Sequence, residues 1–138
     1  MSDMRVVLAN EPAMYREVIS TVLKDLRPRV EVFTAKPEDL DREFSRLLPQ
    51  LVVCSRLTEL VERNAAAWIE LYPDGSSHTL VALGDKRATF ADMDFDTLLT
   101  ILDIADSMRE RNRKTSLLSQ LASIVGERGN ESSEDSSW

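Results

Sequence analysis

The residues best suited to chemistry stand at the end of one short apolar run. Residues 49–53 read Pro-Gln-Leu-Val-Val, and Cys54, Ser55 and Arg56 follow directly. A short apolar run without a polar face predicts a strand that is buried on both sides in the middle of a parallel sheet. Ligands of open α/β sheets bind beyond the carboxyl ends of such strands. A thiol, a hydroxyl and a cation are therefore expected at that edge.

A second polar pair follows the first apolar run of the chain. Residues 5–9 are rich in β-branched side chains and predict another buried strand, which Asn10 and Glu11 follow. Asn10 and Glu11 therefore follow the carboxyl end of the first predicted strand.

The first half of the chain alternates between strand and helix patterns. Strands are predicted at 5–9, 30–34 and 51–54, with helices at 12–26 and 37–48 between them. Such alternation with short connections is typical of right-handed βαβ units and a parallel sheet. The residues expected on the buried faces of the two helices are Met14, Val18, Ile19, Val22, Leu23, Leu26, Leu40, Phe44, Leu47 and Leu48.

The second half has a different pattern. A short helix near 57–61 is followed by predicted strands at 68–72, 79–83 and 87–91, with a tight-turn signal at residues 84–85. No helical stretch separates these last strands. They are therefore expected to form an antiparallel meander.

A C-terminal helical region follows the meander. Asp94 is a strong helix cap, and the domain is expected to span 1–108, with a helical extension at 109–129 and a disordered acidic tail at 130–138. A one-residue register shift argues against a continuous coiled coil. The extension is interpreted as a packing helix or as a dimerisation helix. Its candidate interaction residues are Leu117, Leu118, Leu121 and Val125.

The composition of the chain disfavours several classes of protein. The chain has 138 residues, a formal net charge of -7 and one cysteine. An acidic chain disfavours non-specific binding to nucleic acid or to an anionic membrane, and one cysteine excludes an internal disulfide. No apolar run approaches the length of a bilayer span, so a cytoplasmic location is expected.

The segments 6–12 and 49–55 resemble parts of a response-regulator receiver domain. The first resembles the apolar strand and acidic segment ending in Glu-Pro with which receivers begin. The second is similar to their central strand, and it places Ser55 where the phospho-accepting aspartate stands. This resemblance covers roughly the first sixty residues. It implies a receiver-like (flavodoxin-like) first half. Together with the strand and helix patterns of the whole chain, it predicts a three-layer α/β sandwich with a parallel βαβαβ first half, an antiparallel meander and an extra C-terminal helix.

This sequence differs from the receiver pattern at the residues that bind Mg²⁺ and accept the phosphoryl group. Receivers hold Mg²⁺ with paired carboxylates after the first strand, whereas this chain has Ala9 and Asn10 there and only Glu11 next to them. A serine hydroxyl at position 55 without an adjacent base does not accept a phosphoryl group as an aspartate does. The resemblance therefore implies a degenerate acidic pocket at Asn10 and Glu11 and a degenerate acceptor position at Ser55. No metal, no cofactor and no enzymatic activity are expected.

The leading functional hypothesis is a pseudo-receiver that acts without phosphorylation. It would bind a protein partner or a second copy of itself in bacterial two-component signalling or transcription regulation. A first alternative is a small-ligand or redox sensor at Cys54, Ser55 and Glu11, with Arg56 lowering the pKa of the thiol. A second is an accessory DNA-binding regulator that uses the basic stretch 109–114.

Trp68 and Tyr72 are a further pair of candidate interaction residues. Both are expected on one face of a strand, which could lie at the edge of the sheet. They are interpreted as core residues or as an exposed patch.

Overall fold

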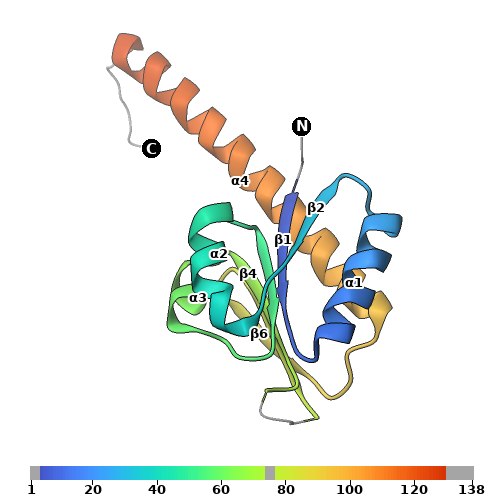
Figure 1. Ribbon diagram of the computed structural model, residues 1–138. Helices are drawn as coiled ribbons and strands as arrows, with labels where there is room; N and C mark the ends of the chain where they lie inside the picture. Colours follow the sequence, from blue (N-terminus) through green and yellow to red (C-terminus); the bar gives the residue numbers. More distant parts are fainter. Residues whose placement is uncertain (1–3, 74–76, 130–138) are drawn as a thin grey trace. The chain divides into compact units, whose positions relative to one another are not determined.

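The computed structural model describes residues 4–73 and 77–129, except for the side chains of residues 110, 112–116, 119 and 123–129. Its sheet has six strands in the order β2-β1-β3-β4-β5-β6 (Figure 1). The strands are β1 (Met4–Ala9), β2 (Val30–Thr34), β3 (Leu51–Cys54), β4 (Ala67–Leu71), β5 (Thr79–Leu83) and β6 (Lys86–Phe90). The helices are α1 (Ala13–Leu26), the 3-10 helix η1 (Pro37–Asp39), α2 (Leu40–Leu47), α3 (Glu59–Asn64) and α4 (Phe95–Gly129).

The predicted fold class is confirmed. Strands β2, β1, β3 and β4 pair in parallel, while β4, β5 and β6 form an antiparallel meander. Helices connect the parallel strands, which cannot be joined by a tight turn. The antiparallel strands β5 and β6 are joined by a two-residue turn. In that turn Gly84 has a φ of 63°, a value that glycine adopts without steric cost.

The protein has two hydrophobic cores, one on each face of the sheet, because successive residues of a strand point to opposite faces. One face packs against α1 and the first turns of α4, and the other packs against α2 and α3 (Figure 1). In β1, for example, Val6 and Leu8 belong to the first core, and Val7 and Ala9 belong to the second. Helices cover both faces, which makes the domain a three-layer sandwich and explains why β1 and β3 read as apolar runs without a polar face.

Two parts of the predicted core are wrong. Met14, Val18 and Leu26 in α1 are exposed, and Leu23 is the apolar residue of this helix that is fully buried. The first turns of α1 lie beside the carboxyl edge of the sheet, where Tyr15 and Val18 line a cavity together with Leu71 and Tyr72. Leu48 is also exposed, because it caps α2 in the left-handed conformation with a φ of 50°.

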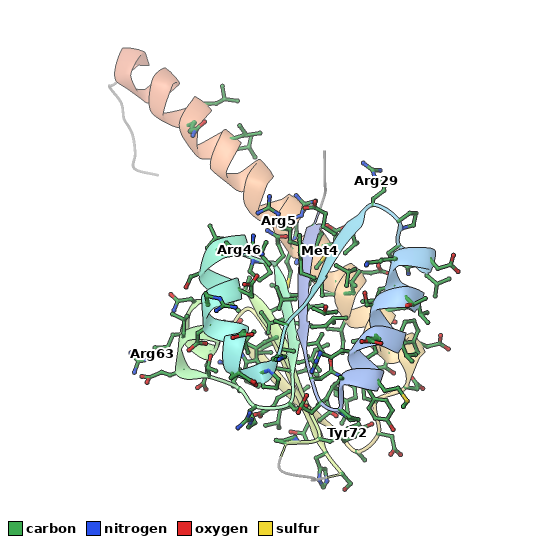
Figure 2. The ribbon with its side chains drawn as sticks, in the orientation of Figure 1. Met4, Arg5, Arg29, Arg46, Arg63 and Tyr72 are labelled. Atoms are coloured by element: carbon green, nitrogen blue, oxygen red, sulfur yellow. The ribbon has the colours of Figure 1, made fainter. Side chains whose placement is uncertain are left out.

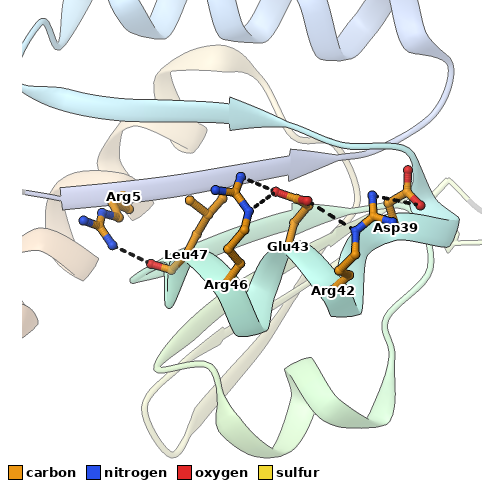
Figure 3. Close-up of polar contacts among 6 residues, drawn as sticks. All are labelled: Arg5, Asp39, Arg42, Glu43, Arg46 and Leu47. Atoms are coloured by element: carbon orange, nitrogen blue, oxygen red, sulfur yellow. Dashed lines mark hydrogen bonds and ion pairs between the residues drawn. The ribbon is translucent and has the colours of Figure 1, made fainter.

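The amino edge of the sheet is held by Arg5. Its guanidinium donates a hydrogen bond of 2.8 Å to the carbonyl oxygen of Leu47 at the end of α2 (Figure 3). Along the same helix the carboxylate of Glu43 lies between Arg42 and Arg46. The hydrogen bond from Arg46, followed by the other contacts with both arginines, lowers the pKa of Glu43. The Arg5 contact joins β1 to the end of α2, whereas the contacts of Glu43 lie within α2 itself.

The chain divides into two compact units, Met1–Asp106 and Ser107–Trp138. Helix α4 belongs to both, and it runs without a break through the polar residues 109–114. The predicted disordered tail at 130–138 lies outside the described residues. Within the described part of the chain, no helix combines the length and the apolar character that crossing a membrane requires.

Candidate functional site

The predicted polar edge forms where β1 and β3 end side by side. Ala9 and Cys54 are register partners in these strands, so Asn10 and Ser55 emerge next to each other. The backbone N–H of Glu11 donates a hydrogen bond of 2.6 Å to Oγ of Ser55. Figure 2 shows Tyr72 at this end of the sheet and Met4 and Arg5 at the opposite end. The structure therefore brings Asn10, Glu11, Cys54 and Ser55 together, as predicted.

Arg16 is a central residue of this edge that sequence reasoning missed. Its side chain is 11% exposed, and Nη1 donates to the carbonyl oxygen of Asn10 at 3.1 Å and to Oε2 of Glu11 at 2.8 Å. A cation in the first turns of the helix that follows Glu11 is the sequence signal that could have found this contact. The only carboxylate of the degenerate pocket is therefore engaged by a guanidinium.

The described residues offer no cation site. Among them, no three His, Cys, Asp or Glu side chains gather where they could hold one metal ion. Mg²⁺ and a transferring phosphoryl group both require oxygen anions close by. The edge instead presents a hydroxyl, an amide and a carboxylate that is paired with an arginine.

The thiol of Cys54 is inert in this setting. Its side chain is fully buried, and burial, followed by the negative charge of Glu70, raises its pKa to about 12. Glu70 is held there because its Oε2 accepts a 2.7 Å hydrogen bond from the backbone N–H of Leu57. The expectation that Arg56 lowers this pKa is wrong, since desolvation and a nearby anion both oppose the thiolate.

Trp68 and Tyr72 do not form one patch. Strand β4 lies between β3 and β5, and Trp68 is buried in the core on the α2 side, with the guanidinium carbon of Arg87 5.4 Å from its ring centroid. Tyr72 follows β4 with a φ of 47°, so strand alternation ends before it. Its half-exposed ring lines a cavity on the α1 side, and its hydroxyl accepts a 3.3 Å hydrogen bond from the N–H of Met93.

That cavity has a volume of about 330 Å³ and opens beside the polar edge. Its walls come from α1, the end of β4 and the start of α4. Cys54 and Ser55, which the ligand-sensor hypothesis placed at a pocket with Glu11, are not among its lining residues. The cavity is lined by Asn10, Glu11, Tyr15, Val18, Ile19, Leu71, Tyr72, Met93, Asp94, Phe95 and Leu98.

The other candidate residues lie in the second unit. Leu117, Leu118 and Leu121 of α4 are 55%, 65% and 58% exposed. Val125 lies in the same helix, but its side chain is outside the described set. In the basic stretch 109–114, Arg109 is partly buried and Arg111 is exposed. The side chains of these three leucines are therefore accessible for contact with another surface.

Comparisons of the chain with protein-family models, with curated proteins and with solved structures gave no match. The resemblance to receiver domains is a prediction from the sequence of segments 6–12 and 49–55.

Proposed function

We propose that this chain is a receiver-like regulatory module that acts without phosphorylation, by pairing with a second copy of itself through the C-terminal part of α4. The observation that carries the proposal is the exposure of Leu117, Leu118 and Leu121 on one helical segment. Residues three and four apart share a helix face, so Leu117 and Leu118 both lie next to Leu121. Such an apolar face is stabilised when another surface covers it.

The polar edge supports the first part of the proposal. A phosphorylatable receiver needs a carboxylate acceptor and a cation site, and this edge has Ser55 and an arginine-paired Glu11 in their place. The hydroxyl of Ser55 accepts a hydrogen bond from the backbone N–H of Glu11, and burial keeps the thiol of Cys54 protonated. A retained scaffold without its acceptor chemistry fits a role in binding.

The charge pattern of the sequence supports a second copy as the partner. Residues 109–114 carry four cations and one acid, whereas residues 127–135 carry four acids and one cation. Leu121 lies between the basic and the acidic stretch in the sequence, so two chains that pair in antiparallel would bring opposite charges toward each other. Complementary charges of this kind set the orientation of helix pairs. The apolar residues that lie between the two charged stretches would form the buried centre.

The mass of the full-length protein in solution tests this proposal. The monomer has a mass of 15.6 kDa, and we expect the wild-type chain to sediment as a dimer. The double variant Leu118→Ser/Leu121→Ser should sediment as a monomer, because polar side chains remove the apolar contact. Leu26→Ser is the matched control, since Leu26 is an exposed apolar residue at the end of α1.

The outcomes separate clearly. A dimer that dissociates in the double variant and persists in Leu26→Ser supports pairing through α4. A wild-type monomer at all concentrations up to the millimolar range contradicts it, as does a dimer that both variants preserve. Equal far-UV circular dichroism of the three proteins shows that loss of the dimer is not loss of the fold.

A further inference from the structure

We infer that the cavity between α1, the end of β4 and the start of α4 binds a small, neutral aromatic molecule that donates one hydrogen bond to Asn10. This inference is independent of pairing through α4, because every residue that lines the cavity belongs to the first unit. The cavity volume of about 330 Å³ lies within the range of small-molecule sites.

The unpartnered oxygen of Asn10 is the first observation behind this inference. Asn10 is 1% exposed, and its Oδ1 is buried without any hydrogen-bond partner. Nearly all buried polar atoms in folded proteins have a partner, and one without a partner is unfavourable. Because Asn10 also lines the cavity, a donor group on a bound molecule could supply the missing hydrogen bond.

The apolar walls are the second observation. Tyr15, Val18 and Tyr72 line the cavity, yet each remains more than one third exposed. Large apolar side chains that stay open around a concave site gain free energy when an apolar body covers them. Two tyrosine rings favour a flat aromatic body, since aromatic pairs stack or meet edge to face.

The charged groups at the cavity determine which ligands fit. Glu11 and Asp94 line it, so a bound anion would meet two carboxylates. Both carboxylates already have partners: Glu11 pairs with Arg16, and Oδ1 of Asp94 accepts a hydrogen bond from the N–H of Thr97. The guanidinium of Arg16 offsets the charge of Glu11, whereas the backbone N–H of Thr97 stabilises Asp94 as an anion. The group that lacks a partner is the acceptor of Asn10, so the expected ligand is neutral and carries an N–H or O–H donor.

Indole and indene are matched probes for this site. They have similar fused-ring shapes, but only indole carries an N–H donor. We expect indole to shift the backbone amide signals of Tyr15, Tyr72 and Phe95 in the full-length protein, measured by two-dimensional NMR. Indene should bind roughly five- to tenfold more weakly, which is the effect of one net hydrogen bond.

The variant Asn10→Leu tests the role of the acceptor. It has a similar side-chain volume and no acceptor, so indole and indene should bind it equally. Because the oxygen has no partner in the wild type, we expect the variant to remain folded with an unchanged thermal midpoint or a higher one. The exposed sheet residue Leu80 provides the control: Leu80→Ala should bind both probes as the wild type does.

Two results would overturn the inference. One is the absence of shifts at cavity residues with either probe at millimolar concentration. The other is equal affinity of indole and indene for the wild type, which would mean that water satisfies Asn10. If Asn10→Leu does not fold, the wild-type ratio of indole to indene affinity still decides the question. Neither result depends on the mass of the protein in solution.

Discussion

Cys54 gives the sharpest quantitative prediction. The thiolate is the reactive form, and burial raises the pKa of this thiol from 9.0 to about 12. At pH 8 the thiolate fraction of an unfolded chain is about one tenth, whereas the native fraction is about one in ten thousand. Titration alone therefore predicts that the native protein reacts with an aromatic disulfide reagent roughly a thousandfold more slowly than the unfolded chain, and burial slows it further.

The assay is direct because the chain has one cysteine. Reagent uptake is followed at pH 8 with and without guanidinium chloride, and Cys54→Ala should show no uptake in either condition. Between pH 8 and pH 11 the native rate should rise about tenfold per unit without a plateau, since the thiol is still titrating. A native rate close to that of the unfolded chain, or a plateau below pH 9, would refute this reasoning and restore the redox hypothesis.

The same pKa shift predicts how stability changes in alkali. The folded protein holds the thiol proton more tightly than the unfolded chain, so this contribution is fully present below pH 9 and is lost as the pH rises toward 12. Three units of pKa correspond to about 4 kcal/mol of unfolding free energy at most. The difference in alkaline slope between wild type and Cys54→Ala, measured by urea unfolding, isolates this contribution. Parallel slopes would contradict it.

Three further predictions concern the core, the start of α4 and its far end. Leu102→Ala removes a fully buried side chain and should cost about 2–5 kcal/mol in urea unfolding, whereas Leu80→Ala on the exposed sheet surface should cost less than about 1 kcal/mol. The hydrogen bond from Thr97 lowers the pKa of Asp94, so the stability lost in Asp94→Ala should be fully present above about pH 4 and should shrink as the pH falls further. Mild oxidation should link Leu121→Cys chains into disulfide dimers and leave Leu80→Cys chains monomeric on a non-reducing gel; equal linkage would argue against pairing near residue 121.

Hydrophobic pattern was sufficient to predict the architecture. Gapless apolar runs at 5–9 and 51–54 identified the two central parallel strands, and the turn residues at 84–85 identified the β5–β6 hairpin. These signals are local, since a strand that is buried on both faces needs apolar residues at every position. The receiver resemblance singled out Asn10, Glu11 and Ser55, and the shared edge of β1 and β3 brings these residues together.

Features that depend on one conformation or on a distant partner were not predictable. The exposure of Leu48 and the turn of Tyr72 away from the face of Trp68 both result from positive φ angles, for which a leucine and a tyrosine give no sequence signal. The raised pKa of Cys54 results first from burial and then from Glu70, which lies on the neighbouring strand β4. Arg16 could be recognised as a cation near Glu11, but its contact with the carbonyl of Asn10 required the fold.

We propose that the carboxyl edge of the sheet does not undergo aspartyl phosphorylation. Incubation of the full-length protein with acetyl phosphate and Mg²⁺, followed by intact mass spectrometry under conditions that preserve acyl phosphates, measures this directly. The arrangement of Asn10, arginine-paired Glu11 and Ser55 predicts an unchanged mass. A stoichiometric gain of one phosphoryl group that hydroxylamine removes would contradict it.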